Sequence, residues 1–468
     1  MVAVGVDRGC GDLRFESQSW GRRGSHFSLA FLCGVKYYAW RSLAPMEMAT
    51  LRADPSTPSA LRRIFRLVWF IFVSCVAAIA VLFALLWSDH LRSTSLPTPT
   101  GPFAVGRAIY DWTDPDAIDP LAPAPNTKRE LLVWIWYPAE RRSSDKVADY
   151  LPRQLREQVA HQSGFVLGQL LARDRGKVHA NALDDPEIST RQPTYPLAIM
   201  RAGGSLEAWN YSALAEDLAS HGYVVAGIDA PYRAITVVFP DGRVINRLPQ
   251  NNPEWCLDKS GAQRDDCVGR ILNASTSDIG FVIDRFGKLR SAEPAGKFAG
   301  RVDTAHVGIF GHSFGGTQTA QFCSTDLRCQ AGVDIDGALE GPVIHNGVHH
   351  PFLILLSDHD RERGSEKQQV LSNLRALYES VPENERQFLW IGGANHYSFG
   401  EGGALIRNQI VISTLRVFGI IRIDPRKQLA ATSYCLRQFF DRFLKSDAKA
   451  QIQVPNSNYP QLEAFPLK

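Results

Sequence analysis

The sequence predicts an α/β fold in which helices cover both faces of a mostly parallel sheet, and three observations support this. Short apolar runs alternate with helix-compatible segments from about Phe103 onward. Several of these runs are apolar on both faces, as strands buried between two layers of helices must be. One of them, residues 307–310, ends abruptly in a glycine-rich turn, and residues 317–323 after it are compatible with a helix.

The expected strands and helices follow one another along the chain. Residues 131–137 (LLVWIWY) are apolar throughout and predict a buried strand, which Pro138 should end. Leu436, Phe439, Phe440 and Phe443 form one apolar side of a closing helix, a stripe typical of core packing. Further strands are expected at residues 196–200, 223–228, 332–335, 352–356 and 388–391, and helices at 209–220, 274–286 and 368–378.

Residues 230–270 interrupt this alternation. Asp241 and Gly242, at the centre of residues 237–244, predict a β-hairpin. A polar loop with Cys256 and Cys267 follows. We interpret the segment as an insertion over the functional face of the sheet, either a lid or ordinary surface.

Residues 67–87 are 21 residues without a charge, which is enough helix to cross about 30 Å of hydrocarbon. Three arginines precede this run and Asp89 follows it. The basic flank should remain cytoplasmic, so the N-terminus is expected in the cytoplasm and the C-terminal bulk outside it, in a single-pass membrane protein. A cleaved signal peptide is the alternative, but the apolar run is longer than the apolar region of a usual signal peptide and has no small-x-small cleavage site at its end.

Composition sets the remaining limits. The chain has 468 residues, of which 45% are hydrophobic, so it can build a large core. Its net charge of +3 gives no indication of nucleic-acid binding. We expect the following divisions: a disordered cytoplasmic leader at 1–60, in which Met46 and Met48 are alternative starts; an anchor at 61–90; a Pro/Thr linker at 91–102; the α/β domain at 103–450; and a tail at 451–468.

The eight cysteines form no C-x-x-C pair and no Cys/His cluster with metal-binding spacing, so we expect no metal. Cys256 with Cys267, and Cys323 with Cys329, each flank a loop and can form a disulfide outside the cytoplasm. Free thiols throughout are equally compatible with the sequence.

Gly311-His312-Ser313-Phe314-Gly315 has the G-x-S-x-G pattern between an apolar strand and a helix. Such a turn forces its serine into a strained backbone conformation, which requires glycine on both sides. Ser313 would then project from the carboxyl edge of the sheet, where the backbone N–H of Phe314 can stabilise an oxyanion. A glycine-rich turn with a solvent-facing serine is the plainer interpretation.

Serine is a weak nucleophile unless a base accepts its proton, and His396 is the best candidate for that base. It follows the last expected core strand in a glycine-rich loop, at the same sheet edge as Ser313. His312 is expected to be a turn residue that points away from the nucleophile. Histidines 345, 349 and 350 precede a strand and would therefore lie at the opposite edge.

Two carboxylates can orient the histidine. Asp336 and Asp358 each end a predicted strand at the correct edge, and the pattern of residues leaves both open. Asp334 would lie within its strand and is a poor candidate. The order serine, acid, histidine along the chain is that of the α/β-hydrolases, whichever of the two acids is used.

Several further motifs occur in the same order as in a known family. They are residues 311–316 (GHSFGG), 332–336 (GVDID), 136–139 (WYPA), 217–223 (DLASHGY) and 393–396 (GANH). Over residues 103–445 the chain resembles the platelet-activating factor acetylhydrolase family, the secreted and type II group of lipoprotein-associated phospholipases. The resemblance implies an α/β-hydrolase fold and places the acid after the strand that follows the nucleophile helix, which is Asp336.

The resemblance also implies a second oxyanion donor. The corresponding family loop usually reads His-Gly-x-Gly, and here it reads Ala202-Gly203-Gly204-Ser205. A backbone N–H does not depend on its own side chain, so Gly204 can still donate. An ordinary Gly-Gly turn is the alternative, since the missing histidine leaves open how the loop is held.

The function that the resemblance implies is a serine ester hydrolase that removes a short, acetyl-like acyl group from a glycerophospholipid. No metal or organic cofactor is expected, and the membrane is an expected partner through the N-terminal helix. A general short-chain esterase or polyester hydrolase is the first alternative. A non-catalytic, membrane-anchored binding module on the same fold is the second.

Overall fold

The computed structural model describes residues 60–162, 174–204, 206–358 and 365–466. Contacts divide the chain into residues up to Val68 and residues from Trp69 onward. Of the first unit only residues 60–68, the start of a helix, are described, so the leader expected at 1–60 lies outside the described residues except for its last one. The rest of the fold belongs to the second unit.

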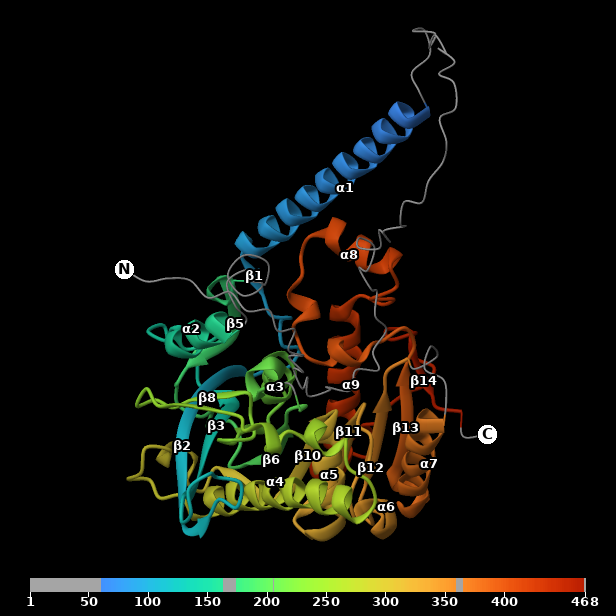
Figure 1. The fold of residues 1–468 in the computed structure, drawn as a ribbon. Helices are drawn as coiled ribbons and strands as arrows, with labels where there is room; N and C mark the ends of the chain where they lie inside the picture. Colours follow the sequence, from blue (N-terminus) through green and yellow to red (C-terminus); the bar gives the residue numbers. More distant parts are fainter. Residues whose placement is uncertain (1–59, 163–173, 205, 359–364, 467–468) are drawn as a thin grey trace, which may run out of the picture. The chain divides into compact units, whose positions relative to one another are not determined.

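The centre of the fold is a 12-stranded sheet (Figure 1). Its order is β1-β5-β2-β3-β7-β6-β10-β11-β12-β13-β14, with β4 paired to β5. The inner strands β7, β6, β10, β11, β12 and β13 run parallel, whereas β3 is antiparallel to both of its neighbours. The bounds are β1 Thr94–Ser95, β2 Ala104–Ile118, β3 Lys128–Ala139, β4 Val147–Asp149, β5 Val178–Asp184, β6 Tyr195–Arg201, β7 Val224–Asp229, β10 Val302–His312, β11 Cys329–Ile335, β12 Phe352–Leu356, β13 Arg386–Ile391 and β14 Leu462–Ala464.

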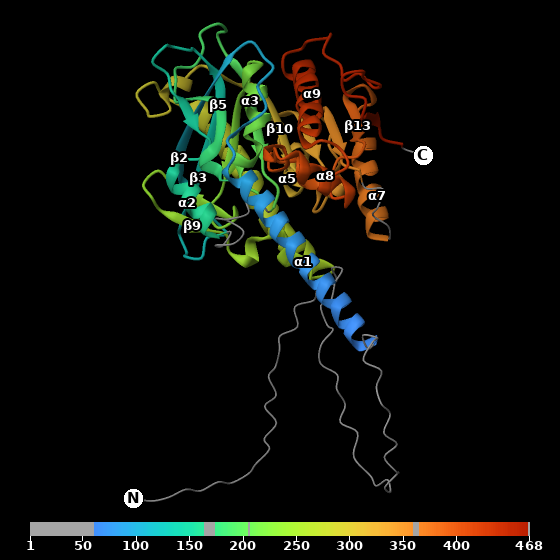
Figure 2. The same ribbon diagram turned by 90° about the horizontal axis from the view of Figure 1, so that it is seen from above.

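Helices bury both faces of this sheet. One apolar cluster joins one face to α3 and α9, and a second joins the other face to α4, α5, α6 and α7. The later elements β13, α7, α8 and α9 gather at one end (Figure 2). The helix bounds are α2 Arg153–Gln162, α3 Ser212–Ser220, α4 Ala262–Lys288, α5 Phe314–Thr325, α6 Val343–Asn346, α7 Ser365–Ser380, α8 Gln409–Val417 and α9 Pro425–Leu444.

The predicted mixed α/β fold with a mostly parallel sheet is confirmed, and each strand predicted inside it is present. The β3 strand is buried on both faces because Trp134 and Trp136 alternate with Val133 and Ile135, and all four are fully buried. Pro138 does not end this strand, which continues to Ala139.

Other boundaries differ from the expectation. The helix expected at 274–286 begins earlier, at Ala262. Its first turns were not predicted because they are polar, except for a short apolar stripe that packs locally. The linker contributes β1, which pairs with β5, and the tail contributes β14, which pairs with β13. Strands this short carry no pattern of their own and form by adding to an existing edge.

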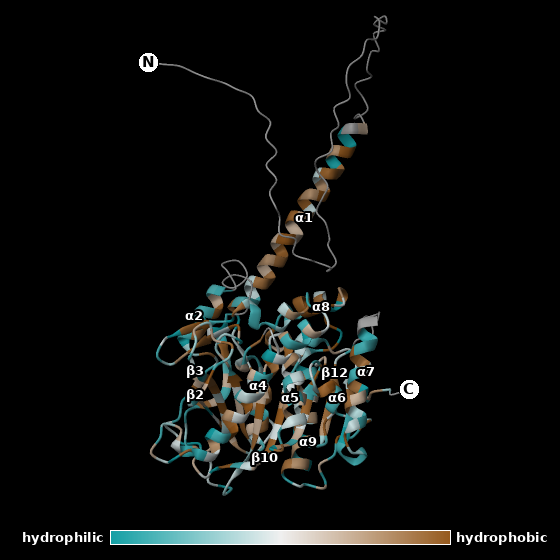
Figure 3. Cartoon of the chain, turned by 60° about the horizontal axis from the view of Figure 1, so that its bottom comes forward, coloured by the Kyte–Doolittle hydropathy of each residue, from teal (hydrophilic) through white to brown (hydrophobic). Residues whose placement is uncertain are grey.

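Helix α1 (Ala60–Leu91) contains the apolar run expected to form an anchor. Within Arg62–Leu91, a stretch of 18 residues has a mean hydropathy of 2.8 and is not buried within the protein, whereas Asp89 and His90 near the end of the helix are buried. Hydrophobic residues follow one another along most of the helix (Figure 3). By length and composition it can cross a membrane, and a signal sequence close to the N-terminus has the same character.

The insertion contains a β-hairpin as predicted, formed by β8 (Thr236–Val238) and β9 (Val244–Asn246). Two 3₁₀ turns, η4 (Pro249–Asn251) and η5 (Pro253–Cys256), lead from it toward α4. Both cysteine pairs that the sequence left open are disulfides, Cys256–Cys267 and Cys323–Cys329. The first closes the polar loop and the second joins α5 to β11.

Candidate active site

Ser313 lies in the sharp turn between β10 and α5. Its backbone has φ +57° and ψ −126°, a left-handed conformation that is strained for a residue with a side chain. The backbone N–H of Ser313 donates to the Ile335 carbonyl at 2.8 Å, which fixes the turn against β11. The hydroxyl is thereby held at the carboxyl edge of the sheet.

The glycines of the motif are required by close backbone approaches. A Cβ atom on Gly311 would lie 2.1 Å from the Gly315 carbonyl oxygen. A Cβ on Gly315 would lie 2.3 Å from the Arg201 carbonyl oxygen, where α5 begins beside the end of β6. A side chain at either position would therefore push the turn open.

His396 begins a short 3₁₀ turn, η8 (His396–Phe399), after β13. Its Nε2 lies 3.0 Å from Ser313 Oγ. The residue before it, Asn395, is held by the Gln428 side chain on α9. Gln428 Nε2 donates to the Asn395 carbonyl at 2.9 Å, and Gln428 Oε1 accepts from the Asn395 N–H at 3.2 Å. Gln428 is fully buried, so this loop is fixed to the core helix.

Asp336 lies on the other side of the imidazole. Its Oδ2 is 2.8 Å from His396 Nδ1, and its carboxylate is fully buried. Ser357, at the end of β12, donates its backbone N–H to Oδ1 and its hydroxyl to Oδ2, each at 2.7 Å. The carboxylate is therefore held in one orientation by three contacts.

The alternative acid makes different contacts. Asp358 Oδ2 accepts from the Gly393 N–H at 3.0 Å and pairs with Arg422 at 2.8 Å. The structure thus brings Ser313, His396 and Asp336 together and uses Asp358 to fix the loop that leads to His396.

Asp334 is fully buried inside β11, as expected from its place in the strand. Burial raises its pKa to about 8, so it is protonated at neutral pH. Its Oδ1 accepts the Gly337 N–H at 2.9 Å, and a Cβ on Gly316 would clash with the same oxygen at 1.8 Å. This residue shapes the turn after β11 and does not contact the imidazole.

The expectation that His312 points away from the nucleophile is wrong. Its buried ring lines the same pocket as Ser313, with its centroid 4.5 Å from that of His396. Burial lowers the pKa of His312 to about 3, so it is neutral. Its Nδ1 lies 2.7 Å from the hydroxyl of Tyr211, which also accepts the Gly203 N–H at 3.2 Å. Because that hydroxyl accepts from Gly203, its proton is available for His312, and the contact joins the glycine loop to the nucleophile turn.

The pocket in front of Ser313 has a volume of about 250 Å³. Phe314 and Gly204 both line it together with Ser313. Since Gly203 uses its N–H on Tyr211, Gly204 is the glycine in this loop that is left as the candidate donor. The remaining lining residues are Gly203, Leu206, Pro253, Glu254, Leu257, His312, Thr317, Ala338, Glu340, His396 and Tyr397.

Sequence reasoning missed several residues that fix the site, namely Tyr211, Ser357, Gln428 and Glu401. Only Ser357 had a local signal, because it follows a buried strand directly. Glu401 is buried and accepts from the Ala213 N–H at 2.8 Å and from the Tyr150 hydroxyl, so it joins the His396 loop to α3. Burial raises the pKa of Glu401 to about 8.

Within the described ranges, no group of three or more His, Cys, Asp or Glu side chains is arranged to hold a metal ion. The groups that meet at the site are a hydroxyl, an imidazole and a carboxylate, and Phe314 and Gly204, the candidate N–H donors, line the same pocket. These are the components of nucleophilic acyl transfer.

Known proteins are similar to this chain in fold or in sequence. A ferulic acid esterase from Streptomyces cinnamoneus has a similar fold, with a TM-score of 0.60 and 24% identity over 80% of this chain and all of that chain. A probable 1-alkyl-2-acetylglycerophosphocholine esterase of Arthroderma benhamiae is 24% identical over 389 residues, 78% of this chain and 92% of that protein. A platelet-activating factor acetylhydrolase of Cavia porcellus is 24% identical over 322 residues, 65% of this chain and 69% of that protein.

The match to a protein family covers most of the chain. Residues 89–255 and 284–458 match the model of platelet-activating factor acetylhydrolase, isoform II. The unmatched residues 256–283 begin at the disulfide Cys256–Cys267 and include most of α4. On the extent of this match, the chain belongs to the platelet-activating factor acetylhydrolase isoform II family.

Proposed function

We propose that this protein is a serine-dependent carboxylic ester hydrolase that acts through an acyl-enzyme. The observation that carries the proposal is the continuous contact from Asp336 through His396 to Ser313, at 2.8 Å and 3.0 Å. Membership of a family named for an acetylhydrolase, and relatives named as esterases, support ester hydrolysis.

The contacts define a role for each group. The buried Asp336 carboxylate accepts from His396 Nδ1–H, so Nε2 keeps its lone pair and can take the Ser313 proton as Oγ attacks the ester carbonyl. The Phe314 and Gly204 N–H groups stabilise the tetrahedral oxyanion. His396 then gives its proton to the leaving alcohol, and a water molecule, activated in the same way, releases the carboxylic acid.

For the substrate, we propose an acetyl or short acyl ester of a glycerophospholipid. The names of the relatives support this class, and a pocket of about 250 Å³ suits a small acyl group. A general short-chain esterase or polyester hydrolase would use the same machinery, and the fold shared with a ferulic acid esterase is compatible with it.

A substrate panel separates these possibilities. We expect kcat/KM on 1-alkyl-2-acyl-glycerophosphocholines to fall at least about tenfold between acetyl and palmitoyl, because the pocket must admit the acyl chain. Hydrolysis of p-nitrophenyl acetate without any hydrolysis of the phospholipids would favour the general esterase. A folded protein that cleaves neither ester and is not labelled by a fluorophosphonate would be a binding module.

We also propose that α1 anchors the protein with its N-terminus in the cytoplasm and the α/β domain outside. The exposed apolar residues of α1 and the arginines at its start support this proposal. The two disulfides fit an oxidising compartment.

A protease-protection experiment tests the orientation. A tag after Lys468 should be digested by protease added to intact cells, whereas a tag before Met1 should be protected until the cells are permeabilised. The opposite pattern would reverse the topology, and release of the α/β domain into the medium without α1 would make the helix a signal peptide.

A further inference from the structure

The insertion contacts the glycine loop that carries Gly204. Arg247 follows β9 and donates from Nη1 to the Gly204 carbonyl oxygen. Its backbone is fixed, because the Arg247 N–H donates to the Ile235 carbonyl at 3.1 Å and the Leu248 N–H donates to the Tyr232 carbonyl at 3.0 Å. The guanidinium therefore approaches the loop from a defined position.

A second residue of the insertion packs on the same glycine. A Cβ atom on Gly204 would lie 3.4 Å from Pro253 Cγ and 3.9 Å from Phe314 Cβ. Gly204 thus lies between Pro253, at the start of η5, and the residue that follows the nucleophile. The ring of Phe314 also packs against the small cluster around the Cys256–Cys267 disulfide.

Contacts on the two peptides that meet at the Gly204 Cα restrict the backbone conformation of this residue: Leu206 holds the peptide that carries the Gly204 N–H, and Arg247 holds the peptide after it. In a trans peptide the C=O and N–H groups point in opposite directions, so holding one sets the other. The Gly203 carbonyl, in the same peptide as the Gly204 N–H, accepts from the Leu206 N–H at 3.1 Å. The Gly204 carbonyl, in the next peptide, accepts from Arg247. Glycine has wide backbone freedom, so both peptides need external contacts to stay in one orientation.

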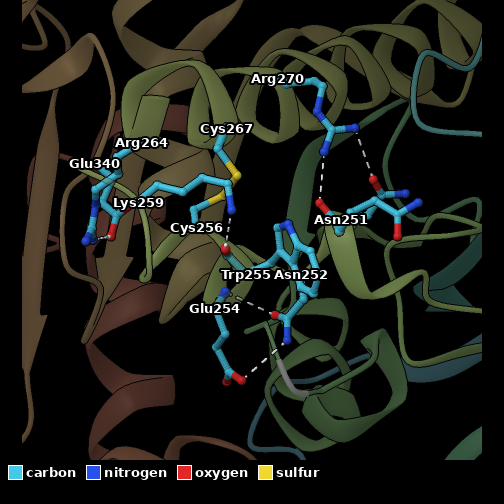
Figure 4. Close-up of a disulfide and its surroundings, with 11 residues drawn as sticks. Asn251, Asn252, Glu254, Trp255, Cys256, Lys259, Arg264, Cys267, Arg270 and Glu340 are labelled. Atoms are coloured by element: carbon cyan, nitrogen blue, oxygen red, sulfur yellow. Dashed lines mark hydrogen bonds and ion pairs between the residues drawn. A yellow bond between two sulfur atoms is a disulfide. The ribbon is translucent and has the colours of Figure 1, made fainter. Parts of the chain in front are cut away.

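The disulfide holds the other end of this segment. Cys256 ends η5 and Cys267 lies in the second turn of α4, with their Cα atoms 5.8 Å apart (Figure 4). Before η5, the buried Asn251 side chain donates to the carbonyls of Leu121 and Tyr232 at 2.9 and 3.2 Å.

Two arginines on α4 also contact the insertion and the residues around the pocket. Arg270 donates to Asn251 Oδ1 at 3.2 Å and to the Gln250 carbonyl at 2.8 Å (Figure 4). Arg264 pairs at 2.8 Å with Glu340, which lines the catalytic pocket. Pro253 is therefore supported from both sides by contacts to the body of the protein.

We propose that the insertion positions the second oxyanion donor of this enzyme, with Arg247 and Pro253 as the positioning residues and the Cys256–Cys267 disulfide as their clamp. This inference rests on the proposed serine mechanism and assigns a function to the disulfide, which lies where the family match breaks off. Neither side chain touches the reacting atoms. Both act by restricting the backbone conformation of Gly204, and so the position of its N–H, which matters most when negative charge develops on the oxyanion.

The first test replaces the arginine in the full-length chain. Arg247→Met keeps the length and apolar stem of the side chain but removes the donor. We expect kcat on a short-chain ester to fall about 10- to 100-fold with KM changed less than about threefold, because misaligning one donor weakens transition-state binding alone. Arg247→Lys, which keeps a donor, should recover part of the loss.

Arg243→Met is the matched control. Arg243 belongs to the same insertion, but its partners are Glu130, Asp241 and Asp111, on a surface away from the pocket. Its kcat should stay within about twofold of the wild type. The thermal unfolding midpoints of the two methionine variants should be similar, so that a change in kcat reflects the site.

The second test removes the clamp. Cys256→Ser/Cys267→Ser should lower kcat about 3- to 10-fold, again with little change in KM, because Pro253 is less firmly held against Gly204. Cys323→Ser/Cys329→Ser removes the other disulfide, which joins α5 to β11 and does not line the pocket. This double variant should keep the wild-type kcat per active site, where the number of active sites is measured by titration.

The outcomes separate the two proposals. Folded Arg247→Met protein with kcat within twofold of the wild type would overturn the positioning role and leave the serine mechanism intact. Equal losses in kcat for the two disulfide variants would overturn the clamp. A wild-type protein that hydrolyses no ester would instead refute the proposed function itself.

Discussion

Replacing Ser313 with alanine should lower kcat for ester hydrolysis by about 10⁴- to 10⁶-fold, the range seen when the nucleophile of a coupled triad is removed. In free energy this is about 5 to 8 kcal/mol of lost transition-state stabilisation. The reason is that no acyl-enzyme can form, and the oxyanion donors can then assist only direct attack by water. KM for a short-chain ester should change little, since the hydroxyl contributes little to ground-state binding.

The measurement is steady-state hydrolysis of p-nitrophenyl acetate, together with labelling by a fluorophosphonate probe. The wild type should be labelled and Ser313→Ala should not be. The Ser313→Ala/His396→Ala double variant should be no slower than either single variant by more than a few-fold, because the two groups act as a unit. Ser324→Ala, later in the same helix α5, should remain active. Full activity in Ser313→Ala would remove the basis of the mechanism.

Replacing Asp336 with asparagine should lower kcat by roughly 10³- to 10⁴-fold. An amide in this position can donate to His396 Nδ1, which favours the tautomer whose proton is on Nε2, facing Ser313. The imidazole then cannot accept the serine proton. The fold should be preserved, because asparagine is nearly isosteric and Ser357 can still contact the remaining oxygen.

Asp358→Asn is the comparison that makes this prediction specific. Asp358 accepts from the Gly393 N–H and pairs with Arg422, so its loss should loosen the loop that leads to His396 and lower kcat less than about tenfold. The two variants should be assayed side by side with thermal unfolding as a check on folding. If Asp358→Asn proves the more damaging of the two, the acid has been assigned to the wrong strand.

The parts of the site that could be predicted from sequence are those whose geometry depends on residues close together in the chain. The turn at Ser313 was predictable because two glycines are needed within five residues, where a side chain on Gly311 or Gly315 would collide with the backbone. His396 was a strong candidate because it follows a buried strand that ends at the same edge. The choice between Asp336 and Asp358 stayed open in the residue pattern, since both follow adjacent parallel strands, and only the family resemblance favoured one.

The supporting residues were beyond sequence reasoning for a different reason. Gln428 contacts a loop 33 residues away, Glu401 contacts α3 from 188 residues away, and Arg247 contacts Gly204 from 43 residues away. Each contact is made by one side chain, so no periodicity or spacing signals it. The same holds for β1 and β14, whose two or three residues pair with edges formed by distant strands.

By itself the sequence determined the mixed α/β fold, the strained serine turn and the set of polar residues at one sheet edge, because strand burial and tight turns depend on neighbouring residues. The tertiary structure alone decided which atoms meet there: Asp336 rather than Asp358 against the imidazole, His312 behind it, and the disulfide-bound insertion against Gly204. Those contacts depend on how strands and loops far apart in the chain pack, to within a few tenths of an ångström, and local residue patterns do not specify that packing.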